Sequence, residues 1–326
     1  MAHGVAVIIV NWNAGEHLRA CLRALAAQTE RGFRAVVVDN ASTDGSPAAV
    51  AELGDPRFEL LTLDRNTGFA YANNIGARHT EATEFIALLN PDAVPQPDWL
   101  AALLRAAAQQ PRAAAFGSHL VDLADRAVSD GTGDCYHWSG RAFRRDHGVA
   151  VARSHRAAGE IFSPCAAAAL YRRAAWEQIG GFDEDFFCYL EDVDLGFRMR
   201  LAGWRCVHVP ESVCYHAGSA LTGRRSDFST YHGQRNMVWV FVKNMPSWLF
   251  WLLAPAHLVL NLLAPPALAR RAQFGVALRA KRDALRAWPA VWAKRRTVQR
   301  QRAASAGAIW RALDKGLWPG QLPPSP

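Results

Sequence analysis

Acidic side chains gather at three places where they could bind a metal ion or accept a proton. Asp39 opens the turn-rich stretch 39–46, and Asp92 ends the short segment Asn-Pro-Asp at 90–92. The third place, residues 183–194, holds six acids in twelve positions. Carboxylates bind divalent cations and act as general bases, so both kinds of chemistry are open to these residues. Taken singly, Asp39 and Asp92 are explained equally well as turn formers or helix caps.

The third acidic cluster combines a helix start with an apolar setting. Glu191, Asp192 and Asp194 begin a predicted helix, where the helix dipole stabilises acidic side chains. The five residues before them, 186–190, are nearly all apolar. A carboxylate at the edge of such a patch is partly desolvated, which raises its pKa and suits a general base.

The elements that position these acids follow an alternating pattern of strands and helices over residues 1–120. Such alternation predicts a parallel sheet with helices on its faces. The predicted strands are apolar runs at 5–10, 35–38, 58–63 and 84–89, and the predicted helices cover 16–28, 69–79 and 97–109. Ligands of open parallel sheets bind beyond the carboxyl ends of the strands. Asp39 and Asp92 each follow a strand, so we expect them at the same edge of one sheet.

The patterns are weaker after residue 120. Residues 122–160 are polar and rich in Arg, His and Gly, and we expect an irregular excursion from the sheet that covers the site. Residues 163–171 are small and apolar and predict a strand. A helix from Ala174 should follow and end at Gly180-Gly181.

Seven stretches, read in order, resemble the motifs of one enzyme family. They are VIIVNWN (7–13), VDNASTDGS (38–46), RNTGFAYANNIG (65–76), LNPD (89–92), GFDEDFF (181–187), EDVDLGFR (191–198) and YHGQRN (231–236). The chain is similar to family 2 glycosyltransferases of the GT-A fold, in their rhamnosyltransferase-like branch. Each stretch alone is weak evidence. The ordered set over residues 5–245 is specific, because the probability that all of the independent motifs match by chance is the product of their separate probabilities.

The resemblance implies a fold and a division of the chain. The expected fold is α/β: a GT-A, Rossmann-like, mostly parallel sheet with helices on both faces, plus a C-terminal helical, membrane-associated appendage. Residues 1–245 would form the catalytic domain, with a nucleotide-binding half at 1–120 and an acceptor half at 121–245. The appendage would cover residues 246–326.

The resemblance also implies roles for single residues. Asp192 would be the catalytic base with Glu191 beside it, and the sequence leaves open which of the two takes the proton. Asp92 and His216 would hold a divalent metal, Mg²⁺ or Mn²⁺, although Asn90 stands where the family's motif has its first acid. The donor-binding residues would be Asn11, Asp39, Asn66, Asn74, Asp92 and Arg235.

Three of these residues also have simpler explanations. A histidine after a strand, such as His216, is often structural. Asn74 fits a polar helix position, and Arg235, four residues after Tyr231 on one helical face, fits a surface salt bridge as well as a diphosphate contact.

The implied reaction is transfer of a sugar from a nucleoside-diphosphate donor to an acceptor hydroxyl, with inversion at the anomeric carbon. A metal would neutralise the leaving diphosphate while the base deprotonates the acceptor. The branch suggests dTDP-rhamnose as donor, and UDP- or GDP-sugars remain open.

The C-terminal part of the chain has a distinct composition. Ser247–Ala269 holds no formally charged residue, and residues 270–326 hold 13 Lys and Arg against Asp283 and Asp314. This tail therefore carries +11, whereas residues 1–269 carry 24 basic and 27 acidic groups. The pattern predicts an apolar segment in the membrane interface, with Trp248 and Trp251, followed by a basic helix on anionic headgroups.

Topology argues against a single crossing of the membrane by 247–269. Nucleotide sugars are cytosolic and the basic tail should also lie inside, so both flanks of the segment lie on one side. We expect a peripheral or monotopic protein at the cytoplasmic face of the plasma membrane, contacting it through 246–302, where 279–302 with Trp288 and Trp292 is one helix. Membrane contact points to a lipid-linked saccharide acceptor in surface-polysaccharide synthesis. The alternative is a core helical hairpin with a solvated basic face.

Bulk features complete these expectations. The six cysteines form no C-x-x-C pair and the N-terminus lacks a secretory signal pattern, which indicates reduced thiols in the cytosol. Rival functions are a nucleic-acid-binding protein, a nucleotidyltransferase and an inactive relative. We expect no nucleic-acid partner, because Ala, Leu and Trp are interleaved with the basic residues of the tail. The stretch 11–15 is not the glycine-rich phosphate loop of a nucleotidyltransferase, and the intact acids argue against an inactive relative.

Overall fold

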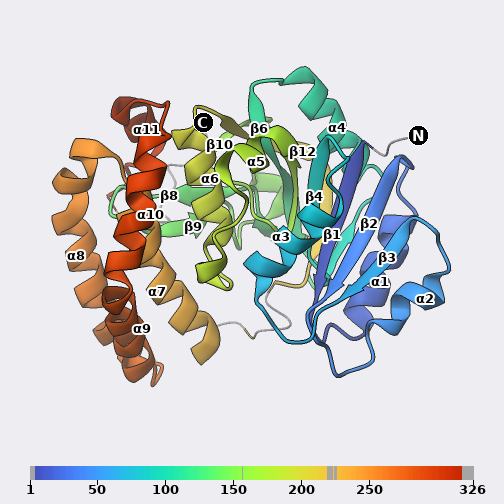
Figure 1. Cartoon of the computed structure of the whole chain (residues 1–326), viewed down its shortest axis with the longest axis horizontal. Helices are drawn as coiled ribbons and strands as arrows, with labels where there is room; N and C mark the ends of the chain where they lie inside the picture. Colours follow the sequence, from blue (N-terminus) through green and yellow to red (C-terminus); the bar gives the residue numbers. More distant parts are fainter. Residues whose placement is uncertain (1–3, 156, 219–222, 224–225, 318–326) are drawn as a thin grey trace.

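The computed structural model describes residues 4–155, 157–218, 223 and 226–317. One ten-stranded sheet forms its centre, in the order β10-β12-β6-β11-β4-β1-β2-β3, with β5 added to β12 and β7 to β6. Helices cover both faces of the sheet, and a group of C-terminal helices stands beside it (Figure 1). The expected α/β class with a mostly parallel sheet and a helical C-terminal region is confirmed.

The first half of the sheet follows the sequence prediction closely. Its parallel strands are β1 (Val5–Asn11), β2 (Phe33–Asp39), β3 (Phe58–Thr62) and β4 (Phe85–Leu89). Its helices are α1 (Glu16–Ala26), the short α2 (Ala48–Leu53), α3 (Phe69–His79) and α4 (Trp99–Gln109). Every residue of β1 is buried because α1 packs on one face of the strand and α3 on the other.

Close approach of α3 to the sheet requires a residue without a side chain. A Cβ atom on Gly76 would lie 2.6 Å from the Ile8 side chain and 3.2 Å from that of Val38. The helix therefore lies directly on β1 and β2, which holds its first turn near the carboxyl ends of these strands.

The second half of the sheet is mixed. It comprises β5 (Ala93–Pro95), β6 (Ala113–Asp122), β7 (Ser129–Gly131), β10 (Gly159–Ile161), β11 (Ala168–Arg172) and β12 (Arg205–His216). β11 runs antiparallel to both β4 and β6, and β12 runs parallel to β6. β11 corresponds to the strand predicted at 163–171 and is shorter than predicted. It is followed by α5 (Arg173–Ile179), the 3₁₀ turn Glu184–Phe186 and α6 (Glu191–Leu201).

Residues 122–160 are more ordered than expected. Besides β7 and β10, they contain the 3₁₀ turn Val151–Arg153 and a hairpin of β8 (Asp134–Tyr136) and β9 (Ala142–Arg144). These strands are three residues long and lack regular alternation, so no sequence period announces them.

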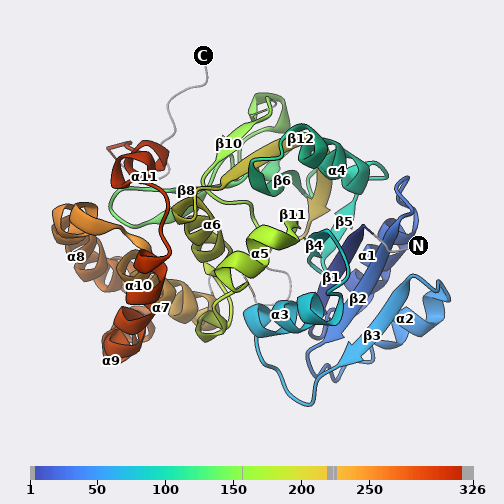
Figure 2. The same ribbon diagram turned by 45° about the horizontal axis from the view of Figure 1, so that its top comes forward.

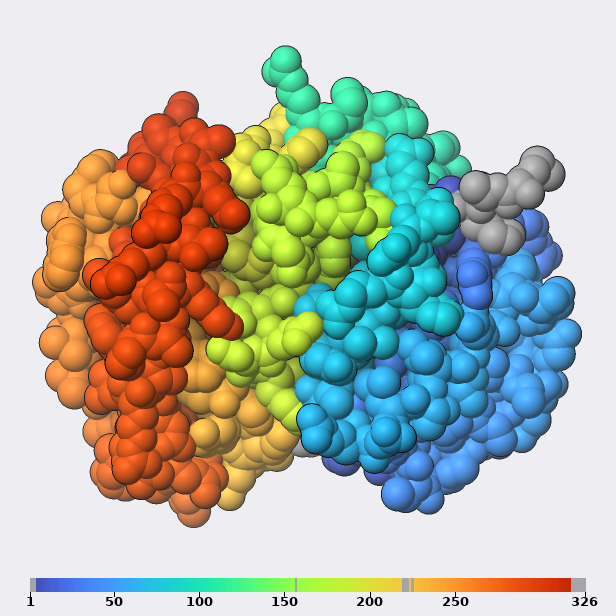
Figure 3. Space-filling model, in the orientation of Figure 1, coloured from blue at the N-terminus to red at the C-terminus, as the bar shows by residue number. Residues whose placement is uncertain are grey.

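The C-terminal helices form a layer of their own on the side of the molecule away from β3 (Figures 1 and 2). They are α7 (Asp227–Asn244), α8 (Ser247–Ala269), α9 (Phe274–Arg286), α10 (Trp288–Arg300) and α11 (Ala306–Ala312). In the space-filling view they abut the segment that carries α5 and α6 (Figure 3). α7 packs against α6 as well as against α9 and α10, so it contacts both sides of the predicted boundary at 245.

Two expectations for this region need comment. The single helix expected over 279–302 is wrong: α9 and α10 meet at Ala287, and Pro289 lies in the first turn of α10. Proline lacks the N–H that a continuous helix would need there and clashes with the preceding turn. In contrast, α8 is one 23-residue helix even though Pro255, Pro265 and Pro266 lie inside it.

Candidate active site

A cavity of about 740 Å³ lies at the carboxyl edge of the sheet and brings together much of the predicted chemistry. Its polar lining comes from well-separated parts of the chain: Asn40, Asn66, Asn90 and Asp92, Asp134 and Arg144, Glu191 and Asp192, and His216. The structure thus places the metal-ligand candidates and the base candidates around one space, as the strand-end argument predicted for Asp92.

The donor side of this edge begins at the ends of β1 and β2. Asn11 and Asp39 are register partners in the parallel pair, and the Asn11 Nδ2 donates to Asp39 Oδ1 at 2.8 Å. The same Nδ2 lies 3.0 Å from Ser42 Oγ and 2.8 Å from Ser46 Oγ. Asp39 also accepts from the Ser42 hydroxyl at 2.6 Å. Both predicted residues are buried, and they form one hydrogen-bonded group at the strand ends.

Asn66 and Asn74 have different surroundings. Asn66 lines the cavity, and its Oδ1 accepts hydrogen bonds from Asn40 Nδ2 and the Gly68 N–H. Asn74 lies one turn into α3, where its amide donates to the Phe182 carbonyl and to Glu184, and accepts from the Phe182 N–H. Asn74 therefore ties α3 to the segment that leads to α6.

The metal-ligand candidates lie side by side because of strand pairing. β5, directly after Asp92, pairs antiparallel with the end of β12, so that His216 stands opposite Ala93. The His216 Nε2 lies 3.4 Å from Asp92 Oδ1 and 3.3 Å from Asn90 Nδ2. The His216 Nδ1 lies 2.8 Å from Asp130 Oδ2. Burial opposes the charged imidazole, but the hydrogen bonds and charges of Asp130 and Asp92 outweigh it and raise the His216 pKa to about 9.

The donor set at this point fits a divalent cation. Asp92 supplies a carboxylate and His216 an imidazole nitrogen, and the buried Oδ1 of Asn90 has no hydrogen-bond partner among the described residues. Within those residues no three His, Cys, Asp or Glu side chains gather as a complete cation site. Further ligands would therefore have to come from water and from the donor phosphates, as is usual for Mg²⁺ or Mn²⁺ at a nucleotide.

The base candidates occupy the first turn of α6. Asp192 Oδ1 accepts from the Val193 N–H at 2.8 Å, and Oδ2 accepts from the Ala166 N–H at 3.2 Å. Burial raises the pKa of Asp192 above its usual value, although these N–H groups and Arg144 oppose the shift. Burial and the charge of Asp192 raise the pKa of Glu191 well above its usual value, and its Oε2 has no hydrogen-bond partner among the described residues. Burial therefore favours the protonated form of Glu191.

Three side chains of the segment 122–160 lie at this site although the sequence patterns did not predict them: Asp130, Asp134 and Arg144. Arg144 stands opposite Asp134 in the β8–β9 pair, and its Nη1 donates to Asp130 Oδ2 at 2.6 Å. Burial and the charge of Asp192 raise the pKa of Asp134 to about 8. Arg144 therefore joins the carboxylates near the base to the Asp130–His216–Asp92 chain. A clue was available, since acids at 130 and 134 and a base at 144 flank Gly140, as cross-strand charge pairs in a hairpin do.

Arg235 faces the segment before α6. It lies on α7, over the rings of Tyr231 and Trp239, and its Nη2 donates to the carbonyls of Asp185 and Phe186 at 3.0 and 2.9 Å. In this geometry the guanidinium holds the backbone of the segment before α6. The contact of Arg235 with a diphosphate stays a prediction.

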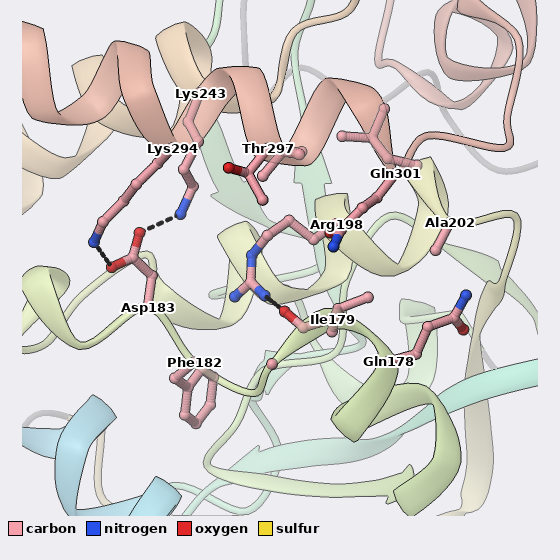
Figure 4. Close-up of a pocket in the computed structure, with 13 residues that line it drawn as sticks. Gln178, Ile179, Phe182, Asp183, Arg198, Ala202, Lys243, Lys294, Thr297 and Gln301 are labelled. Carbon is pink, nitrogen blue, oxygen red and sulfur yellow. Dashed lines mark hydrogen bonds and ion pairs between the residues drawn. The ribbon is translucent and has the colours of Figure 1, made fainter.

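A second cavity, of about 490 Å³, shows how the C-terminal helices hold α6 (Figure 4). Asp183 lies between Lys243 of α7 and Lys294 of α10 and pairs with both. Lys243 Nζ also lies 2.7 Å from Asp194 Oδ1, which accepts from Asn244 Nδ2 as well. Lys243 of α7 therefore holds α6, which carries Asp192, through Asp194, while Lys243 and Lys294 together hold the segment before α6 through Asp183.

The fold and the site together define a class of enzyme. A mostly parallel sheet with helices on both faces, and acidic side chains and a histidine around one cavity at its carboxyl edge, agree with the expected GT-A glycosyltransferase fold. The family model described as Glycosyl transferase family 2 matches residues 6–180, and the chain belongs to this family. It is a glycosyltransferase.

Individual relatives agree with this assignment. A Mycobacterium tuberculosis protein named N-acetylglucosaminyl-diphospho-decaprenol L-rhamnosyltransferase is 34% identical over 241 residues, which cover 67% of this chain and 77% of that protein. Among solved structures, a mannosyltransferase from Pyrobaculum calidifontis in complex with GDP-Man and Mn²⁺ matches with a TM-score of 0.56 at 21% identity, over 96% of this chain and 88% of that one. GalNAc-T7 with UDP, GalNAc and Mn²⁺ matches with a TM-score of 0.60 at 15% identity, over 73% of this chain and 47% of that one. The structural matches support the fold.

Proposed function

We propose that the protein transfers a sugar, with inversion, from a nucleoside-diphosphate donor to a lipid-linked saccharide in cell-surface polysaccharide synthesis. The observation that carries this proposal is one cavity with Asp92 and His216 on one wall and Asp192 on another. The rhamnosyltransferase named above, 34% identical, supports rhamnose as the sugar and a lipid-diphosphate saccharide as the acceptor. For the nucleotide of the donor we propose dTDP, as the motifs of the rhamnosyltransferase-like branch suggest.

Asp192 is the base in this proposal, for reasons of charge. The side chain is ionised more readily than Glu191, because backbone N–H groups bind both of its oxygens. Burial and the neighbouring charge of Asp192 raise the pKa of Glu191 well above its usual value, which favours its protonated form. Asp192 takes the proton of the acceptor hydroxyl as the oxygen attacks the anomeric carbon opposite the leaving diphosphate, and a single displacement inverts the configuration.

Asn11, Asp39 and Asn66 would bind the donor from the strand ends, and Asp92, His216 and Asn90 would hold a divalent cation, Mg²⁺ or Mn²⁺. Bound there, the cation would supply positive charge to the diphosphate. Asp130 orients the imidazole of His216 from its other ring nitrogen. Asn74 and Arg235 would influence donor binding indirectly, through the segments of the chain to which they are hydrogen-bonded.

A prediction follows for Asp130, whose side chain is 1% exposed. Asp130→Asn should weaken Mn²⁺ activation by about 10–100-fold, because groups that orient a metal-binding histidine usually contribute that much. The concentration of Mn²⁺ at half-maximal activity measures this effect. Asp125→Asn, an exposed acid in the same segment, is the matched control. Equal Mn²⁺ dependence in Asp130→Asn and the unaltered enzyme would contradict the role.

Membrane contact would be made by α8 and α9. Among the described residues, α8 is the one helix long and apolar enough to cross a membrane. Its exposed side chains recur at helical spacing and form one face: Trp248, Trp251, Leu252, Leu258, Val259, Leu262 and Leu263. Phe274, Leu278 and Leu285 extend this face on α9, and the basic tail follows in the sequence. An anionic lipid surface matches both the apolar face and the positive charge. We place the protein at the cytoplasmic face of the plasma membrane, as a peripheral or monotopic protein.

Flotation with anionic liposomes tests this surface. The protein should float with vesicles at low salt and less at high salt, because part of the attraction is electrostatic. Replacing Trp251 and Leu262 by Glu should abolish flotation, whereas Leu60→Glu, at another exposed apolar site, on β3, should not. Absence of the unaltered protein from the floating fraction at either salt concentration would reject the membrane proposal.

A donor panel tests the proposed function without a known acceptor. Purified enzyme with Mn²⁺ is given dTDP-, UDP- and GDP-sugars separately, and slow release of the nucleoside diphosphate is measured. We expect release from one donor class, and dTDP-rhamnose first. Pyrophosphate from a sugar phosphate and a nucleoside triphosphate would instead indicate the rival nucleotidyl transfer.

A further inference from the structure

Aromatic side chains form one wall of the active-site cavity next to the proposed base. Phe187 and Tyr189, from the segment before α6, and Phe228, in the first turn of α7, all line the cavity that Asp192 lines. The ring centroid of Phe228 lies 6.3 Å from that of Tyr189 and 6.1 Å from that of Phe187. Phe228 remains 39% exposed, which leaves part of its ring available at the mouth of the cavity.

The backbone that carries this wall is strained. Phe187, Tyr189 and Leu190 have φ angles of 65°, 67° and 66°, in the left-handed region that side chains other than glycine rarely adopt. Strain of this kind persists where surrounding contacts impose it, and it concentrates at functional sites. It brings the rings of Phe187 and Tyr189 to the cavity wall just ahead of Asp192.

Asn236 of α7 imposes this conformation. Its fully buried Nδ2 donates to the carbonyls of Phe186, Cys188 and Tyr189 at 3.1, 2.9 and 2.7 Å. One amide group thus binds three carbonyls within four residues of the strained segment. This is a specific arrangement rather than general packing.

The two ends of the wall have different neighbours. Phe187 lies against the donor side, where a Cβ atom on Gly68 would come within 2.6 Å of its ring. Tyr189 lines the cavity together with Glu191 and Asp192, which follow it in the chain. Phe228 lies in the first turn of α7, beside the start of α9, because Gln273, the residue before Phe274, is hydrogen-bonded to both Asp227 and Thr230.

We propose that Tyr189 and Phe228 form the acceptor subsite, where one face of the acceptor's terminal sugar stacks on these rings. The C–H face of a pyranose is apolar and suits an aromatic surface, while its hydroxyl edge turns to Asp192. A lipid attached to that sugar would leave the cavity past Phe228 toward the exposed apolar face of α8 and α9. This inference rests on the proposed function, and it adds the residues that recognise the saccharide.

The test uses full-length enzyme and a short-chain prenyl-diphosphate-GlcNAc as the probe. Phe228→Ala should raise the acceptor KM by roughly 5–10-fold, the usual worth of a ring contact, with little change in the KM for donor. Phe228→Trp should restore the acceptor KM to near that of the unaltered enzyme. Trp12→Ala, which removes a similarly exposed ring from the strand-end side of the cavity, should leave the acceptor KM unchanged.

Binding measured by calorimetry separates this inference from the proposed function. If the enzyme binds and hydrolyses its donor but Phe228→Ala binds the probe as tightly as the unaltered enzyme, the subsite is wrong and glycosyl transfer stands. Failure to hydrolyse any nucleotide sugar would instead refute the proposed function. A tenfold rise in the donor KM of Phe228→Ala would also overturn the assignment, because it would place the ring at the donor.

Discussion

Replacing Asp192 by Asn should lower kcat by about 10²–10⁴-fold, the usual contribution of a general base, and should leave donor affinity nearly unchanged. Asn has the shape of Asp but cannot take a proton. The carboxylate lies in the first turn of α6, where its two oxygens accept two backbone N–H groups. Asn keeps the size of the side chain and, through its single oxygen, one of these two hydrogen bonds. Steady-state rates with donor and acceptor, together with donor binding by calorimetry, measure the two effects separately.

Glu191→Gln is the matched control for this prediction. Glu191 is the adjacent residue and lines the same cavity. Burial favours its protonated form, which is neutral, and the side chain of Gln is neutral as well. We expect its effect on kcat to be much smaller than that of Asp192→Asn. A larger loss in Glu191→Gln would exchange the roles of the two acids, and an unchanged rate in Asp192→Asn would refute the assignment of the base.

Asp92→Ala should weaken the binding of donor in the presence of Mn²⁺ by roughly 100-fold or more. The substitution removes the carboxylate that the proposal assigns to the cation, beside His216, and leaves Asp130 and Asn90 as the contacts of the His216 ring nitrogens among the described residues. A metal–phosphate contact is worth several kcal/mol, and each 1.4 kcal/mol is tenfold in affinity. Calorimetry with donor, with and without Mn²⁺, gives the effect directly.

The control for Asp92 is Asp98→Ala. Asp98 precedes α4, and it accepts a hydrogen bond from Thr29 at an exposed position away from the cavity. Its loss should not alter the binding of donor. The metal site would be refuted if Asp92→Ala bound donor with the same affinity and the same Mn²⁺ dependence as the unaltered enzyme.

The parts of the site that were predictable depend on local patterns. Val5–Val10 is an uninterrupted β-branched and apolar run, and a strand of that kind is buried on both faces, so its carboxyl end could be placed without the structure. The same holds for Asp39 and Asp92, since each follows a strand. The acids at 191–194 were predicted to matter because an apolar run ends in them at a helix start, and the family resemblance singled out Asp192 among them.

The rest depends on pairings between distant residues. Asp130 and Arg144 reach the site through strands of three residues, whose register is decided by contacts with β6 and within the hairpin. Arg235 is on the predicted helix, but only the packing of α7 on the 185–190 segment turns its guanidinium to backbone carbonyls. The break between α9 and α10 could have been anticipated, because Pro289 stands inside the predicted helix.

The most direct test of the whole account is transfer itself. Enzyme with Mn²⁺, dTDP-rhamnose and a short-chain prenyl-diphosphate-GlcNAc should yield the acceptor enlarged by one deoxysugar of inverted anomeric configuration, together with an equal amount of dTDP. Asp192→Asn run in parallel should form almost none. Formation of a product that retains the donor's anomeric configuration, or no nucleoside diphosphate from any donor in the panel, would contradict the account.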